Sequence, residues 1–180
     1  MEIPIIVILL ILLLSIWVIS TQRRLTVMSE NVESAMNQIG VQLSSRYDML
    51  VATLNQAADY DAHMACNLIA KVNFHRCVIT SGSTTGEIME QEKMIQSVLD
   101  EMEKLVRQHS EIKENDNYRK FMEAVDSYGR MLQTSTLIYN DSVTKFNRAV
   151  CMMPTKLIAG IMGFQQCLSL IHISEPTRPD

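Results

Sequence analysis

The chain begins with an apolar segment that constrains its fold more than any other feature. Residues 3–19 are uncharged, and only Pro4 and Ser15 interrupt a run in which fourteen residues are Ile, Leu or Val. Transfer of those fourteen side chains into a bilayer is favourable by about 4 to 8 kcal/mol. Seventeen helical residues rise about 26 Å against a hydrocarbon core of about 30 Å, and Ser20 and Thr21 can extend the span. The segment predicts a membrane anchor that includes Ile3, Leu10, Trp17 and Ile19.

The charges around this segment favour an uncleaved anchor over the alternative, a cleaved secretory signal. A signal peptide needs positive charge before its apolar stretch and small residues at a cleavage site after it. Here Glu2 precedes the stretch, and Arg23 and Arg24 follow it closely. The positive-inside rule then predicts an outward N-terminus and a cytoplasmic remainder. We expect a single-pass signal-anchor in the plasma (inner) membrane.

Composition limits the rest of the chain to one domain of ordinary size. The 180 residues carry a net charge of −4 and no basic stripe with interleaved aromatic residues, which argues against a nucleic-acid partner. Six Gly, four Pro and thirteen Met favour helices. Cys66, Cys77 and Cys151 are irregularly spaced, so we expect reduced, buried thiols and not a disulfide framework.

Apolar residues recur at helical spacing in three stretches after the anchor. The first includes Val32, Met36, Ile39, Leu43, Tyr47, Leu50 and Leu54, and we expect this helix to continue from the anchor to about Val78. The second follows a turn over residues 80–86, begins with a capping box of Thr84 and Glu87, and ends near His109. The third is a sustained seam from Tyr118 to Val150.

These patterns predict an all-α chain: an N-terminal single transmembrane helix followed by an elongated antiparallel bundle of three to four helices. Pro154 ends the third stretch, and residues 155–164 can form a last short helix. We divide the chain into an anchor with its flank (1–24), a helical bundle (25–167) and a tail (168–180). The tail resembles a translated sequencing adapter, so we predict that it is not native and exclude it, with His172, from fold and site reasoning.

Several motifs in the predicted bundle resemble the signatures of the LemA family. Its C-terminal signature is matched by Asn117-Tyr118, by residues 139–143 (Tyr-Asn-Asp-Ser-Val), by Phe146-Asn147, by Pro154 and by Gly163-Phe164. Arg46-Tyr47-Asp48 resembles the earlier signature, although residues 49–54 lack the proline that commonly follows it in the family. The resemblance covers about residues 31–164. It implies a bacterial or phage-encoded single-span protein with a small outer N-terminus and a helical-bundle domain.

Catalytic and metal-binding patterns are weak in this sequence. No Glu-x-x-His pair of the kind used in di-metal bundles occurs, and the only His/Cys cluster is His63, Cys66, His75 and Cys77. Its H-x2-C and H-x-C intervals differ from those of zinc sites, so we expect a plain helix end with buried cysteines, with a zinc site as the alternative. We predict no catalytic residue, cofactor or metal.

Six polar or aromatic residues form a candidate interaction or register face: Arg46, Tyr47, Asp48, Tyr139, Asn140 and Asn147. Tyr139 lies on the apolar seam and is expected in the core. Asn140 and Asn147, seven residues apart, share one helix face and are expected to bond to a partner helix near Arg46 and Asp48. Buried contacts that fix the register of the bundle are one interpretation, and a groove for a peptide or protein is the other.

The sequence favours a non-catalytic scaffold or regulator of other proteins at the membrane. Its expected partners are the lipid bilayer and either an unidentified protein or a second copy of the chain. The alternative is a metal-dependent or hydrolytic membrane enzyme that uses His63, His75 and nearby acids. A transmembrane sensor is a third hypothesis, which the very small outer segment disfavours.

Overall fold

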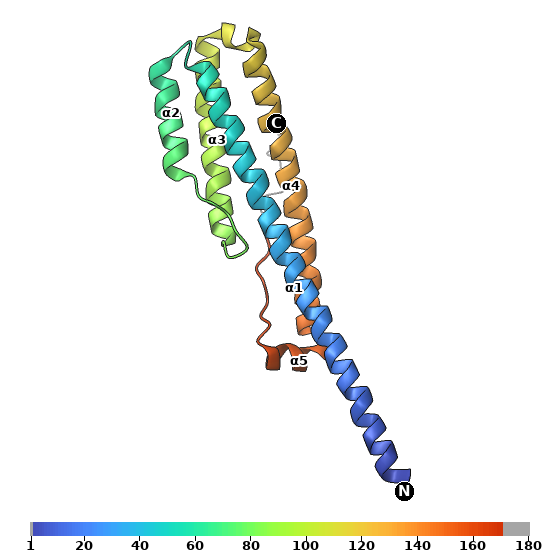
Figure 1. Cartoon of the computed structure of the whole chain (residues 1–180). Coiled ribbons are helices and arrows are strands. Elements are labelled where there is room, and N and C mark those ends of the chain that lie inside the picture. The colour runs from blue at the N-terminus through green and yellow to red at the C-terminus, as the bar shows by residue number, and fades with distance from the viewer. Residues whose placement is uncertain (1, 171–180) are drawn as a thin grey trace, which may run out of the picture.

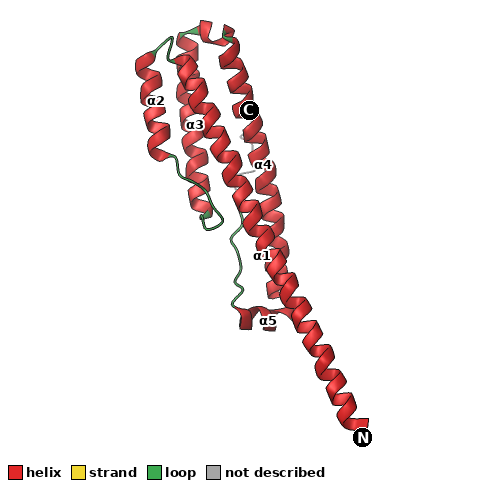
Figure 2. Ribbon diagram, in the orientation of Figure 1, coloured by secondary structure: helices red, strands yellow, loops and turns green. Residues whose placement is uncertain are grey.

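The computed structural model describes residues 2–170, which fold into five α-helices and one short 3-10 helix (Figure 1). No strand forms within this range (Figure 2). The elements are α1 (Glu2–Ala57), α2 (Ala62–His75), α3 (Thr85–Gln108), η1 (Ser110–Glu114), α4 (Asp116–Cys151) and α5 (Thr155–Met162). The all-α prediction is confirmed.

Helix α1 joins the apolar segment to the bundle without a break. It runs for 56 residues, and its first part contains the one stretch of the described chain that is long and apolar enough to cross a membrane. The side chains of residues 3–19 are all exposed, because no other part of the described fold covers them. The hydroxyls of Ser15 and Thr21 donate to the carbonyls of Ile11 and Trp17, each at 2.9 Å, so neither leaves an unsatisfied polar group in the span.

The bundle is built on the long antiparallel pair of α1 and α4, and α2 and α3 cover the half farthest from the N-terminus (Figure 1). All seven apolar residues of the stripe predicted for α1 are buried. On α4, eight seam positions are buried, while Phe121 and Tyr128 are half-buried. Lys71 of α2 donates to Ser97 at 2.8 Å and pairs with Glu101 at 2.7 Å, which fixes α2 on α3.

The helix ends follow from local capping. Thr84 accepts from the Glu87 N–H while the Glu87 carboxylate accepts from the Thr84 N–H, so the predicted capping box of α3 is confirmed. Asn115 caps α4 by accepting from two main-chain N–H groups. Gly163, at φ +77°, ends α5 in the left-handed region that favours glycine, and this reverses the chain.

Two expectations about the middle of the chain are wrong. The first helix does not continue to Val78, because α1 ends at Ala57 and the Asp61 carboxylate starts α2 by accepting from the Met64 N–H at 3.0 Å. Cys66, Cys77 and Cys151 are exposed and not buried. Cys66 lies beside the buried stripe of α2, Cys77 lies in the linker to α3, and Cys151 ends α4 just past the core.

After α5 the chain returns along the bundle as an extended segment (Figure 1). The Phe164 N–H bonds to the Ala159 carbonyl at 3.0 Å, and the Phe164 ring packs edge-on against Phe146 with ring centroids 6.1 Å apart. Leu170 is buried at 2 % exposure. Residues 168–170 of the predicted non-native tail are therefore packed on the bundle, and its residues 171–180, including His172, lie outside the described part.

Candidate functional site

The first cluster of polar side chains, which we call the polar node, consists of Arg46, Tyr47, Asp48, Arg76, Gln91 and Glu92. At its centre the Arg46 guanidinium donates to both oxygens of Glu92 on α3, at 2.9 and 3.0 Å. The two side chains are only 12 % and 25 % exposed. Gly129 of α4 lies against the guanidinium, where a Cβ would come within 3.3 Å of it. Arg46 thus bridges α1 to α3 at a point where α4 also approaches.

Tyr47 and Gln91 connect the node to the linker that precedes α3. The Tyr47 hydroxyl donates to the Gln91 carbonyl at 3.1 Å, and burial, with a smaller contribution from Glu92, raises the pKa of Tyr47 above its ordinary value. The buried Gln91 side chain donates to the His75 carbonyl at 2.6 Å and accepts from the Cys77 N–H at 3.2 Å. Gln91 therefore satisfies the main chain where α2 ends.

Asp48 completes the node on its exposed side. Its carboxylate pairs with Arg76 at 2.7 Å, and Arg76 also donates to the Ser44 hydroxyl at 2.7 Å. The Arg76 guanidinium lies 5.9 Å from the centre of the Tyr47 ring, within the range of a cation–π contact. Each of the three side chains of the Arg46-Tyr47-Asp48 motif thus holds α3 or the α2–α3 linker against α1.

The second cluster, which we call the asparagine clamp, consists of Tyr139, Asn140 and Asn147 on α4. The Asn147 amide donates to the Cys167 carbonyl at 2.8 Å and accepts from the Cys167 N–H at 2.9 Å. Asn140 does the same for Leu170, at 3.1 and 2.6 Å. Between them the Tyr139 hydroxyl donates to the Leu168 carbonyl at 3.0 Å, and burial raises the pKa of Tyr139. These five bonds are made to main-chain groups, and the Ser169 hydroxyl adds a sixth by donating to the Asn140 oxygen at 2.8 Å.

The spacing of the clamp explains why two asparagines seven residues apart act together. Seven residues of α-helix rise about 10 Å, and three extended residues from Cys167 to Leu170 span about the same length. An amide side chain offers one donor and one acceptor, which matches the N–H and C=O of one extended residue. Asn140 and Asn147 therefore bind one extended segment at both ends, mainly through its main chain.

The six predicted residues thus separate into two groups that do not share a face. Gly129 is the α4 residue that lies against Arg46, and Asn140 is about 16 Å farther along α4. The partner of Asn140 is an extended segment and not a helix. Tyr139 is buried, as expected. The partners Arg76, Gln91 and Glu92 were not predicted. Gln91 and Glu92 fill the gap between Ile88 and Ile95 in the stripe of α3, and this polar interruption is the signal that could have found them.

The predicted His/Cys cluster does not assemble. His63 and Cys66 lie on the first turns of α2, whereas His75 ends that helix and Cys77 follows it. Twelve helical residues between the two histidines correspond to about 18 Å, too far for a shared metal ion. Among residues 2–170 no group of three His, Cys, Asp or Glu side chains is placed to hold a metal.

Removing the Glu92 carboxylate should show how much the polar node contributes to the unfolding free energy. In Glu92→Ala the Arg46 charge stays mostly buried without a partner, so we expect a loss of about 1 to 2 kcal/mol in unfolding free energy, after a discount for partial exposure. Thermal unfolding of the full chain in detergent, followed by circular dichroism, measures this loss. Glu103→Ala, which breaks the fully exposed pair with Arg107, is the control and should leave Tm unchanged. Equal Tm values for the two variants would contradict the prediction.

Comparison with known proteins gives one family. The model of the LemA family matches residues 35–178, a range that contains both clusters and extends past Leu168. No curated protein and no solved structure gave a significant match.

Proposed function

The chain belongs to the LemA family, and we propose that this member is a single-span membrane protein whose cytoplasmic bundle scaffolds or regulates other proteins without catalysis of its own. The observation that carries the proposal is the continuity of α1. An exposed apolar stretch and the core stripe of the bundle belong to one helix of about 84 Å, so the anchor continues into the bundle without a linker.

The polar residues support a structural rather than a chemical role. Arg46, Asp48 and Glu92 form ion pairs between elements. The side-chain oxygen and nitrogen of both Asn140 and Asn147 bond to main-chain groups. A general acid, base or nucleophile needs a group free to meet a substrate. The residues that resemble the family signatures are instead committed to holding the bundle and its returning segment.

The surface of the long helix pair supports a protein partner. Several large apolar side chains remain exposed there outside the span: Val27 and Val41 on α1, and Met131, Leu137 and Ile138 on α4. Ile138 also lines a shallow groove between the two helices with Met28, Ala35 and Lys145. Such an interface is suited to a helix or a loop of another protein.

The anchor and its orientation are tested by fusing reporters to the C-terminus of the full chain. We expect a reporter active only in the cytoplasm to work and one active only outside to fail, because Arg23 and Arg24 retain the bundle inside. A matched variant that moves the charge, Glu2→Lys with Arg23→Gln and Arg24→Gln, should shift both readouts toward the opposite orientation. An active external reporter on the unaltered chain would refute the orientation. Loss of an N-terminal epitope tag would indicate a cleaved signal instead.

A further inference from the structure

We propose that α5 and the residues just before it lie on the anionic surface of the bilayer, with Met153, Leu157 and Ile161 inserted among the lipids. This inference rests on the proposed membrane anchor and adds a second contact with the membrane. The bundle would then be fixed at its base by a crossing helix and by a helix lying in the interface, and its tilt would be restricted.

The position of α5 along the bundle is the first argument. A pocket at the base is lined by Trp17, Thr21 and Arg24 of α1 and by residues 152–155, where α4 passes into α5. Trp residues concentrate at the membrane–water interface, so this pocket marks the level at which the span ends. Helix α5 begins at that level and lies across the base of the bundle where α1 leaves it (Figure 1).

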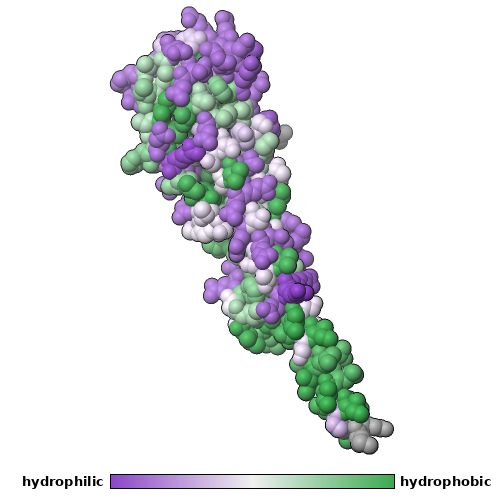
Figure 3. All heavy atoms as spheres, in the orientation of Figure 1, coloured by the Kyte–Doolittle hydropathy of each residue, from purple (hydrophilic) through white to green (hydrophobic). Residues whose placement is uncertain are grey.

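The exposure of the apolar side chains around α5 is the second argument. Ile158 and Ala159 are buried against the bundle, whereas Leu157 is 61 % exposed and Ile161, one turn later, is 87 % exposed. Met153, just before the helix, is 67 % exposed. Apolar surface gathers at this level, next to the bare apolar anchor (Figure 3). A helix with one face on its own fold and a second apolar face outward needs an apolar environment.

The distribution of charge is the third argument and favours an anionic surface. Residues 3–29 and 146–164, which form the membrane end of the fold, contain four Lys or Arg and no Asp or Glu. Residues 30–145 contain eleven Lys or Arg and seventeen Asp or Glu. Lys145 pairs with Asp141, while Arg23, Arg24, Arg148 and Lys156 make no ion pair within the described residues.

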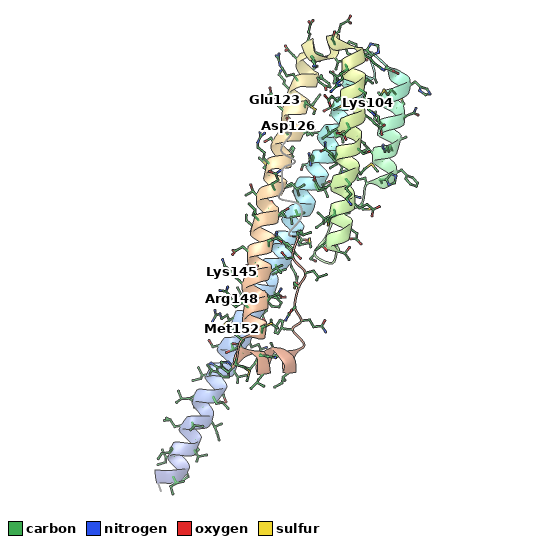
Figure 4. All side chains as sticks on the ribbon, turned by 180° about the vertical axis from the view of Figure 1, so that it is seen from behind. Lys104, Glu123, Asp126, Lys145, Arg148 and Met152 are labelled. Atoms are coloured by element: carbon green, nitrogen blue, oxygen red, sulfur yellow. The ribbon has the colours of Figure 1, made fainter. Side chains whose placement is uncertain are left out.

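The basic side chains are also close enough to act on lipid headgroups. Lys145 and Arg148 of α4, and Met152 just after that helix, follow one another toward α5 (Figure 4). Arg148 lies only a few residues above the start of α5, within a Debye length of about 8 to 10 Å of the expected surface. Clustered basic side chains at this distance attract anionic lipids, and the acidic remainder of the bundle is repelled. The basic side chains and the exposed apolar side chains therefore lie at the same end of the bundle, which favours contact of that end with an anionic bilayer.

The single tryptophan of the chain allows a direct test. The full-length protein is reconstituted in vesicles of phosphatidylcholine and phosphatidylglycerol with brominated acyl chains, which quench only inserted tryptophan. Three proteins are compared: the unaltered chain, Trp17→Phe with Ile161→Trp, and Trp17→Phe with Phe74→Trp as the matched control. Phe74 is 84 % exposed on α2, in the half of the bundle away from the anchor. Iodide on both sides of the bilayer reports exposure to water.

We expect the Ile161 probe to lose most of its fluorescence to brominated lipid and little to iodide, and the Phe74 probe to do the reverse. If the Trp17 probe is quenched by lipid but the Ile161 probe responds to iodide like the Phe74 probe, the anchor stands and the docking of α5 is refuted. If the Ile161 probe is shielded from both quenchers, a second copy of the chain covers α5 and the bilayer does not. If Trp17 itself is not quenched by lipid, the proposed anchor fails, and this inference fails with it.

Discussion

Replacing Gly40 by alanine should destabilise the bundle by about 2 to 3 kcal/mol, although alanine is the better helix former. Gly40 faces the main chain of Ile79 in the α2–α3 linker, and an added Cβ would overlap the Ile79 carbonyl oxygen. The obstacle is a backbone atom of a buried residue, so a side-chain rotation cannot relieve it. The linker must move away from α1 and carry Arg76 and the Cys77 N–H out of the polar node. For a domain of this size Tm should fall by about 5 to 10 °C.

A matched glycine provides the control for this experiment. Gly160 lies inside α5 with no atom within 4 Å of an added Cβ, so Gly160→Ala should leave Tm unchanged or raise it through helix propensity. Hydrogen exchange supplies a second readout, since the Cys77 amide is protected by Gln91 and should exchange faster in Gly40→Ala. A Tm for Gly40→Ala at or above that of the unaltered chain would contradict the close approach.

The helices with a long apolar period could be predicted from the sequence. The seam from Tyr118 to Val150 corresponds to α4, and the capping box at Thr84 sets the start of α3, because both signals are local to their helices. The turn between α1 and α2 could not be placed, since residues 58–61 contain neither Gly nor Pro. Asp61 starts α2 by accepting from the Met64 N–H, but an Asp residue in the sequence does not by itself predict that bond.

The contacts between segments that lie far apart in the chain could not be predicted from the sequence. Gly40 reads as a weak point of a long helix, whereas in the fold it admits the linker. The spacing of the two asparagines predicts their common face on α4, but the segment they bind lies partly in the adapter-like residues 168–180. The helical spacing of polar residues predicts which face of the helix they share, but it does not identify the segment that they bind. That segment reaches α4 because the chain turns at Gly163, which the periodicity does not show.

The double variant Asn140→Ala with Asn147→Ala should release the returning segment and lower the unfolding free energy by about 3 kcal/mol. Five of the six bonds of the clamp disappear, each with a typical net contribution of about 1 kcal/mol, and the burial of Leu170 is lost with them. The released segment regains conformational entropy, which offsets part of this loss. Thermal unfolding measures the change, and proteolysis between residues 164 and 170 should become faster.

Substitutions in the returning segment can distinguish whether its main-chain bonds or its side-chain packing hold it on α4. Leu168 is 76 % exposed, so Leu168→Ala should leave Tm unchanged. Leu170→Ala shortens a buried side chain but keeps both bonds to Asn140, whereas Leu170→Pro also removes the N–H that donates to the Asn140 oxygen at 2.6 Å. We expect the proline variant to fall between Leu170→Ala and the double asparagine variant in Tm and in proteolysis, because both Asn147 bonds to Cys167 remain. If Leu170→Ala were as damaging as Leu170→Pro, side-chain burial would hold the segment. If the proline alone is damaging, the main-chain bond to Asn140 holds the segment.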